Sequence, residues 1–341
     1  MSSTDIASPP RRSLADLALR LRLSGVVVFL VLLGTVFAAL SPQFLSWQNF
    51  GVITSNAAIL AIVAAAQATV LLTRNLDVSV GSIMGFSAYL SADYAASHPG
   101  VGVELLFIAL ALGGALGLIN GLIVAYAKVS PLIATLGTMS LFRGATYIYA
   151  HGQEITSSKL PRWMLSAVDL RLAGLSSLVL VAIVVVAGLA LFLRFIPLGR
   201  RVYAVGSNPL ASVFYGLRTE RVVLFAYVLA GVMCGFAGLL YAARVGTVTV
   251  VLASGWELTS LASAVLGGVS VTGGSGSVIG AALGAVVLSC IDNGLVLLRI
   301  PEFWRMFVQG AAIILAVSVD VFISVRIRRS LRRQRFGGRL A

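Results

Sequence analysis

Residues 174–196, GLSSLVLVAIVVVAGLALFLRFI, contain no acidic side chain and a single basic one, Arg194. An apolar run of this length suits an α-helix that crosses the hydrocarbon layer of a membrane. The rest of the chain has the same character, because 59% of its 341 residues are hydrophobic and only 11% are charged. So few charges could not cover a surface that faces water. The sequence therefore excludes an ordinary soluble domain and predicts an all-α, polytopic membrane protein.

Similar apolar runs recur along the chain, separated by polar breaks. We expect about ten membrane-spanning helices, some of them broken, at residues 24–41, 52–73, 79–97, 103–127, 132–150, 174–196, 222–243, 257–272, 277–298 and 303–323. The run at 257–272 is short and rich in Ser, Thr and Gly, so it is either a broken or re-entrant helix or a helix packed closely through its small residues. This places a membrane domain at 24–323 between a basic arm at 1–23 and a basic tail at 324–341.

The distribution of Lys and Arg sets the orientation of the chain. An even number of spans puts both termini on one side of the membrane. If that side is the cytoplasm, eighteen of the 25 Lys and Arg residues lie inside and six lie outside. The remaining one, Arg143, falls within a span. This asymmetry agrees with the preference of positive charge for cytoplasmic segments. We therefore expect both termini in the cytoplasm, and we assign the net charge of +13 to orientation and to anionic lipid rather than to nucleic acid.

The sequence offers no residues for catalysis or for metal binding. Cys234 and Cys290 lie in apolar runs, where a thiol behaves as a small hydrophobe, and His98 and His151 stand alone in polar breaks. The glycine-rich run GGVSVTGGSGSVIG at 267–280 lacks the GK[ST] of a phosphate loop, so we interpret it as a tight turn between packed helices. We therefore expect no catalytic residue, no metal site and no nucleotide site on this chain.

The stretch TRNLDVSVGS at 73–82 places polar and charged side chains in an otherwise apolar region. A charge within a membrane is costly unless it meets a partner or a water-filled cavity. Two interpretations remain open. Either the stretch is a cytoplasmic turn in which Asp77 or Ser79 caps the next helix, or it is a helix break buried in the bundle beside a transport path.

The longest inner loop is PLGRRVYAVGSNPLASVFYGLRTER at 197–221. Asn208 is a good N-cap, Pro209 suits a first helical turn, and Gly216 can end a short helix of about two turns. Such a helix, surrounded by arginines, can dock to a cytoplasmic partner or lie on anionic headgroups. The longest outer loop, at 150–173, has mixed charges and one Trp, so it either receives a soluble partner outside the cell membrane or is a solvated loop with Trp163 at the headgroups.

Four segments, in order along the chain, resemble the permease subunits of bacterial ABC importers for ribose-like monosaccharides. They are LTRNLDVSVGS (72–82), INGLIVAYAKVSPLIATLGTMSLFRG (119–144), GRRVYAVGSNPLASVFYGL (199–217) and ELTSLASAVLGGVSVTGGSGSVIGAALGAVV (257–287). The resemblance runs from about residue 50 to residue 320. The segment PEFWRMFVQG (301–310) and the first segment look most like the rhamnose-type branch, and the autoinducer-2 permeases are the second choice.

The resemblance implies a ten-span fold with a pseudo-twofold inverted repeat in the bacterial inner membrane. Segments 114–125 and 280–297 share a GALG-like start and an NGL on spans of opposite direction, as such a repeat requires. The implied partners are cytoplasmic ATPase subunits, a second permease of the same or a related chain, and an extracytoplasmic sugar-binding protein. ATP is then bound by the ATPase, so the permease is expected to be a transport subunit without enzyme activity or a cofactor of its own.

The same resemblance identifies the helix in the inner loop as a coupling helix, which sits in a groove of the ATPase. The coupling residues expected on this basis are Asn208, Pro209, Ala211, Tyr215, Gly216 and Leu217.

Polar residues in or beside the spans are the candidates for the translocation path. Those placed nearest to it are Asn75, Asp77, Ser79, Thr135, Thr138 and Asn293. The commoner role of such side chains is a helix cap or an interhelical hydrogen bond. An ion-coupled secondary transporter is the competing class, motivated by Asp77, Glu257 and Asp292. An intramembrane enzyme is motivated only by His151 and those acids.

Overall fold

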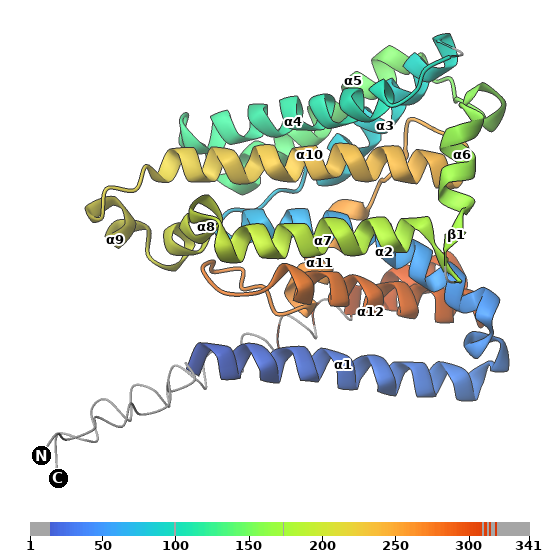
Figure 1. Cartoon of the computed structure of the whole chain (residues 1–341), viewed down its shortest axis with the longest axis horizontal. Coiled ribbons are helices and arrows are strands. Elements are labelled where there is room, and N and C mark those ends of the chain that lie inside the picture. The colour runs from blue at the N-terminus through green and yellow to red at the C-terminus, as the bar shows by residue number, and fades with distance from the viewer. Residues whose placement is uncertain are drawn as a thin grey trace, which may run out of the picture.

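The computed structural model describes residues 14–318 apart from 99, 173, 309, 312, 313 and 315–317, with side chains from residue 25 onward except that of residue 169. The described part is a bundle of helices (Figure 1). Its long helices are α1 (Leu14–Leu40), α2 (Trp47–Leu72), α3 (Val80–Ser97), α4 (Glu104–Ala125), α5 (Pro131–Ala150), α7 (Ser177–Phe195), α10 (Thr219–Val245) and α12 (Val278–Leu297). The tail at 324–341 and most of the arm at 1–23 lie outside what is described.

Shorter elements connect or interrupt the long helices. They are the 3-10 turns η1 (Pro42–Leu45) and η2 (Ser157–Lys159), the helices α6 (Arg162–Asp169), α8 (Pro197–Ser207), α9 (Pro209–Phe214) and α11 (Trp256–Leu266), and the strands β1 (Arg171–Leu172) and β2 (Leu175–Ser176), which pair antiparallel. Figure 1 shows α9 at one end of the bundle and α6 with β1 at the other.

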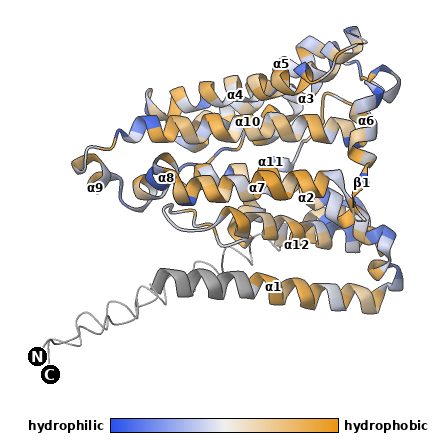
Figure 2. Ribbon diagram, viewed as in Figure 1, coloured by the Kyte–Doolittle hydropathy of each residue, from blue (hydrophilic) through white to orange (hydrophobic). Residues whose placement is uncertain are grey.

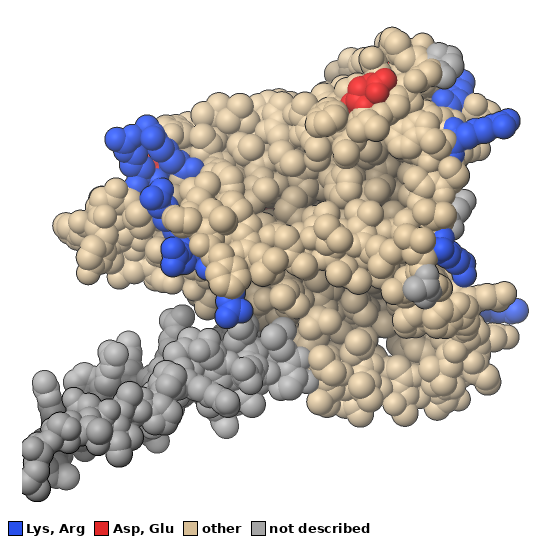
Figure 3. Space-filling view, viewed as in Figure 1, with Lys and Arg blue, Asp and Glu red and all other residues tan. Residues whose placement is uncertain are grey.

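Five of the described helices, α2, α4, α7, α10 and α12, are long and apolar enough to cross a membrane. Figure 2 shows their hydrophobic residues along the bundle and hydrophilic ones mostly at its ends. On the face seen in Figure 3, Lys and Arg gather at the two ends with a broad belt free of them between. A polytopic helical membrane protein is therefore confirmed, whereas ten spans and the position of the termini stay predictions.

Each predicted span has a helix at its position, with two differences in length. α11 is only 11 residues long, and Gly267 and Gly268 follow it. The run at 257–272 is thus a short helix, and Gly267 and Gly284 bring it into backbone contact with α12, as expected for close packing through small residues. Helix α1 begins at Leu14 rather than at residue 24, since the arginines of the basic arm do not prevent helix formation. Of the expected tenth span, helix is described over 302–308.

Helix α2 forms the centre of the bundle. Every residue from Ala57 to Leu72 is buried, and α7, α10, α11 and α12 all pack against it. A helix that is apolar all round must be covered by other helices, which explains its central place. Helices α4 and α7 leave large apolar side chains such as Phe107 and Val184 exposed, as expected where lipid covers the protein.

Glycines bring α4 and α10 into backbone contact. A Cβ on Gly113 would collide with the carbonyl oxygen of Gly231, and one on Gly117 with the carbonyl oxygen of Tyr227. Small residues spaced four apart allow this approach of two helices within a membrane. Two sets of helices pack in the same way. Helices α11 and α12 both pack on α2, and helices α3 and α4 both pack on α10. An inverted repeat would produce this pairing, although the repeat itself stays a prediction.

Candidate functional sites

The polar stretch predicted at 73–82 forms the connection between α2 and α3. Helix α2 ends at Leu72 and α3 begins at Val80, and between them Arg74 adopts a left-handed conformation with φ of 65°. Asp77 and Ser79 are completely buried. The connection is therefore a helix break inside the bundle, and not an exposed cytoplasmic turn.

Neither Asp77 nor Ser79 caps α3 with its side chain, because Ser79 is the N-cap residue and no side-chain hydrogen bond within the described ranges reaches the first amides of the helix. Asp77 instead holds Ser79. Its Oδ1 accepts hydrogen bonds from the Ser79 backbone N–H at 2.8 Å and from the Ser79 hydroxyl at 2.6 Å. The Ser79 Oγ in turn accepts one from the Asn120 side-chain amide of α4 at 2.7 Å. The structure therefore favours the buried helix break, in which Asp77 fixes the residue that begins α3, while a place beside a transport path stays a prediction.

Two further helices hold the break. The N–H of Val78 donates to Thr135 Oγ1 of α5 at 3.1 Å, and the hydroxyl of Tyr227 on α10 donates to the carbonyl of Leu76 at 2.8 Å. Thr138 lies one turn further along α5, and its hydroxyl donates to the Thr135 carbonyl at 3.3 Å. Side chains from α4, α5 and α10 therefore converge on the break.

The cluster keeps two oxygen atoms without a hydrogen-bond partner. Asp77 Oδ2 and Asn120 Oδ1 are both buried, and neither has a donor among the described residues. Unpaired buried acceptors are costly, and they are stabilised by any donor that reaches them. Both oxygens can accept a hydrogen bond from a hydroxyl group, but they are enclosed in this structure, so such a donor reaches them only if the surrounding helices move apart.

The remaining two path candidates lie elsewhere. The side-chain amide of Asn75 donates to the Thr73 carbonyl at 3.0 Å and to the Thr73 hydroxyl at 2.8 Å, so it closes the end of α2 locally. Asn293 is buried on α12, which packs mainly on α2, α11 and α1. Within the described part of the chain, no hydrogen bond joins it to the cluster around Asp77.

Sequence analysis missed the role of Asn120 and Tyr227. A lone Asn in the apolar segment GALGLINGLIVA is a usable signal, because an amide in a membrane helix needs a partner. Tyr227 gave no such signal, since a Tyr in an apolar run is common. Its hydroxyl reaches the break only because α10 packs against α2 and α3.

Arg143 and Glu257 form a second polar group, at the start of α11. Arg143 donates to the Leu252 carbonyl at 2.8 Å, and Glu257 Oε1 accepts from the Gly255 N–H at 3.2 Å. Both side chains lie against glycines of α3, Glu257 beside Gly81 and Arg143 beside Gly85. The first turns of α3 and α11 therefore meet inside the bundle with charged groups beside them.

The loop at 197–221 contains the short helix predicted after Asn208, α9, and also α8, which the sequence did not predict. Asn208 Oδ1 accepts a hydrogen bond from the Ala211 N–H at 3.0 Å, Pro209 occupies the first turn, and Gly216 ends the segment with φ of 76°. The six-residue helix α9 projects at the end of the bundle (Figure 1). Its geometry agrees with the expected short helix, while its role in coupling is a proposal.

Large apolar side chains cover the outer side of α9. Leu210, Val213, Phe214 and Tyr215 are 76%, 58%, 90% and 87% exposed, whereas Ser212 is buried against the bundle. Of these, only Tyr215 was among the predicted coupling residues. An exposed apolar patch of this kind is typical of a surface that contacts another protein or a membrane. We name these four residues the α9 patch.

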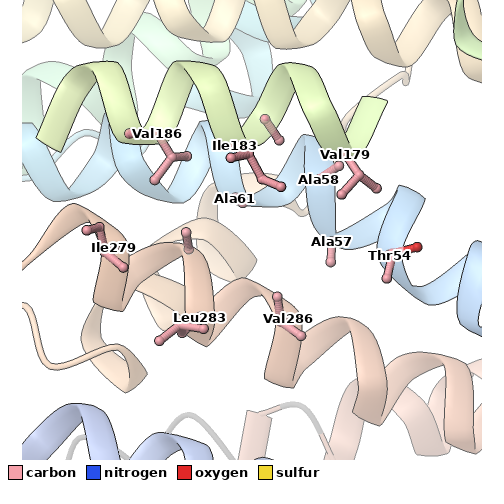
Figure 4. Close-up of a pocket in the computed structure, with 13 residues that line it drawn as sticks. Thr54, Ala57, Ala58, Ala61, Val179, Ile183, Val186, Ile279, Leu283 and Val286 are labelled. Atoms are coloured by element: carbon pink, nitrogen blue, oxygen red, sulfur yellow. The ribbon is translucent and has the colours of Figure 1, made fainter. Parts of the chain in front are cut away.

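An apolar groove lies between α2, α7 and α12 (Figure 4). Its volume is about 330 Å³, and Thr54 is its one lining residue with a polar side chain. The Thr54 hydroxyl already donates to the Phe50 carbonyl at 2.8 Å. Such a groove gives no hydrogen bonds to a polar solute, so it is unsuited to a sugar.

The outer loop at 150–173 is folded rather than loose. The chain at Ile155 pairs with Val248, and the indole N–H of Trp163 on α6 donates to the Val101 carbonyl at 2.8 Å. Hence Trp163 is fixed to the bundle instead of anchoring a free loop at the headgroups. We name η2, α6, β1 and β2 together the outer platform.

The described bundle, with five helices able to cross a membrane, defines a polytopic membrane protein, and its buried polar break and apolar α9 patch are the features that a function must explain. Residues 49–317 match the family model for the branched-chain amino acid transport system / permease component. The chain belongs to this permease family, in its group of ABC importers of the ribose and autoinducer-2 type, whose members are inner-membrane transport subunits served by a separate ATPase.

Relatives named autoinducer 2 import system permease protein LsrC resemble most of the chain. Identity is 38% over 315 residues in Escherichia coli (strain K12 / DH10B), covering 92% of this chain and 90% of the relative. It is 37% in Salmonella typhi, covering 92% and 88%, and 34% in Yersinia enterocolitica, covering 92% and 85%. No solved structure matches. These relatives favour the autoinducer-2 branch over the rhamnose-type branch that the sequence had placed first.

Proposed function

We propose that this chain is the permease subunit through which an ATP-driven importer carries an autoinducer-2-like, hydroxyl-rich small molecule into the cell. The observation that supports it best is the similarity to autoinducer-2 permeases over 92% of the chain. The cluster around Asp77 supports the same class of substrate, because its free acceptors suit hydroxyl donors.

In this proposal, each end of the bundle binds a different partner protein. On the cytoplasmic side, the α9 patch is the docking surface for the ATPase, whose closure on ATP moves α9. On the outer side, the folded platform receives the binding protein that delivers the substrate. A second permease, identical or related, completes the transporter, and arginines at the hydrophilic ends contact anionic lipid.

An ion-coupled transporter is less well supported. Of its three motivating acids, Asp292 pairs with Arg305 at 3.2 Å and Glu257 lies beside Arg143. Asp77 accepts two hydrogen bonds from Ser79. The one histidine that motivated an intramembrane enzyme, His151, ends α5 in a left-handed conformation.

Substrate identity is tested by competition in a reconstituted transporter. The permease, its own ATPase and its own binding protein are placed in liposomes, and uptake of labelled autoinducer-2 is measured against unlabelled autoinducer-2, rhamnose and ribose. Autoinducer-2 should compete at the lowest concentration. Stronger competition by rhamnose or ribose would reassign the substrate while leaving the importer class intact.

Asp77→Asn should lower uptake by about tenfold or more, because a hydrogen bond to a charged group contributes about 1.5–3 kcal/mol. Asn can still accept from Ser79 through its oxygen, so the helix break should remain folded. The matched control is Asp93→Asn, near the far end of α3, the helix that follows the break. Equal uptake by both variants would remove Asp77 from the path.

A further inference from the structure

Three segments far apart in the sequence meet beside α9. They are the end of α2 with Arg74, the end of α8 with Gly206 and Ser207, and the glycine-rich loop at Gly273 and Gly274. We name this meeting point the junction. It lies directly before Asn208, the residue that caps α9.

Arg74 joins the helix break to α8. Its Nε donates to the Gly206 carbonyl, and its Nη2 donates to the Ser207 carbonyl at 2.9 Å. These are the last two carbonyls of α8, which have no partner within their own helix. A cation at a helix C-terminus is also favoured by the helix dipole. Arg74 therefore caps the C-terminus of α8 with a side chain that comes from another part of the chain.

The glycine-rich loop is joined to both of the other segments. The Gly274 N–H donates to the Leu72 carbonyl at 3.0 Å, and the Ser207 hydroxyl donates to the Gly274 carbonyl at 3.2 Å. The Tyr203 hydroxyl of α8 donates to the Gly276 carbonyl at 3.2 Å. The loop that leads into α12 is thus fixed to the same place.

Two of the contacts at the junction join backbone to backbone. A Cβ on Gly206 would collide with the Leu72 carbonyl, and Gly274, with φ of 70°, lies directly against Ser207. Contacts between backbones adjust little, so a displacement of one segment moves the others. The sequence predicted only a tight turn for the glycine-rich run at 267–280, whereas its glycines also allow this contact between backbones.

We propose that Arg74 is the positioning residue that transmits movement of α9 and α8 to the helix break with Asp77, and that the junction carries the same movement to α12. The carbonyls that Arg74 binds belong to Gly206 and Ser207, the two residues before Asn208. Arg74 itself is three residues before Asp77. The inference rests on the proposed function, because it requires that an ATPase moves α9.

The test uses the complete transporter in liposomes and measures molecules imported per ATP hydrolysed. Arg74→Met keeps an unbranched side chain as far as the position of Nε and removes both hydrogen bonds and the charge. The matched control is Lys128→Met, which removes an equal charge from another left-handed residue in the turn after α4. Lys128 forms only an exposed ion pair with Glu220, at 2.9 Å, which contributes little.

Arg74→Met should still purify with the ATPase, and should import at least about tenfold fewer molecules per ATP, within the usual range of coupling between sites. Lys128→Met should keep the wild-type ratio. If Arg74→Met imports as many molecules per ATP as the wild type, the inference is overturned. This holds also when uptake and hydrolysis both fall but their ratio is unchanged. A wild-type transporter that imports without ATP would instead overturn the proposed function.

A second measurement needs no variant. Hydrogen exchange of the wild-type transporter is compared with and without a non-hydrolysable ATP analogue. The amides of 73–82 should change their exchange rate when the ATPase closes, and those of α6 should not. Unchanged exchange at 73–82 in a complex whose ATPase has closed would contradict transmission through the junction.

Discussion

Phe214→Asp should abolish binding of the ATPase to the permease without unfolding the permease. Phe214 is 90% exposed on α9 and touches little of its own chain, so the bundle loses almost nothing. At the interface, a carboxylate placed where an aromatic ring was buried should weaken binding by more than about 2 kcal/mol, the scale of an interface hot spot. Leu210→Asp should act in the same way.

The measurement is copurification of the ATPase with tagged permease, together with the thermal unfolding temperature of the permease alone. Leu45→Asp is the control, because Leu45 is 73% exposed at the opposite end of the bundle. Retention of the ATPase by both α9 variants would place its docking surface elsewhere. A lowered unfolding temperature would show instead that α9 belongs to the core.

Gly117→Leu should prevent the bundle from forming. The Tyr227 carbonyl of α10 occupies the place of a Cβ, so a side chain there must separate two helices that now touch through their backbones. Overpacking costs about 1–3 kcal/mol, and more where, as here, the obstacle is backbone that cannot move aside. Tyr227 would also be drawn away from the carbonyl of Leu76, and the helix break would lose one of its supports.

The yield of monodisperse protein in size-exclusion chromatography checks this prediction. Gly188→Leu is the matched control on α7, since nothing lies within 4 Å of a Cβ built there. The control should behave like the wild type. Equal yields of the two variants would mean that α4 and α10 do not pack through their glycines.

Local signals predicted the elements of the fold well, because they are carried by short stretches of sequence. Apolar runs placed the helices, and Asn208, Pro209 and Gly216 placed the ends of the α9 segment. The early start of α1 was not predicted, since an arginine-rich segment can be helical as well as loose.

The sites depended on contacts between distant segments, and the sequence predicted them only in part. Asp77, Ser79 and Thr135 were selected as polar residues in apolar surroundings, and the fold brings them together with Asn120. Asn293 was selected for the same reason, but it lies on α12 and not in this cluster. Arg74 was one of the polar and charged residues of the 73–82 stretch and had no separate prediction, and its contacts 132 and 133 residues away could be seen only in three dimensions.

The energy source of transport tests the central claim most directly. Wild-type permease is reconstituted with its ATPase and binding protein, and uptake of labelled autoinducer-2 is followed with ATP on the cytoplasmic side, without ATP, and with a protonophore. We expect uptake that requires both ATP and the ATPase and that is unaffected by the protonophore. Uptake that persists without the ATPase and collapses with the protonophore would contradict the account.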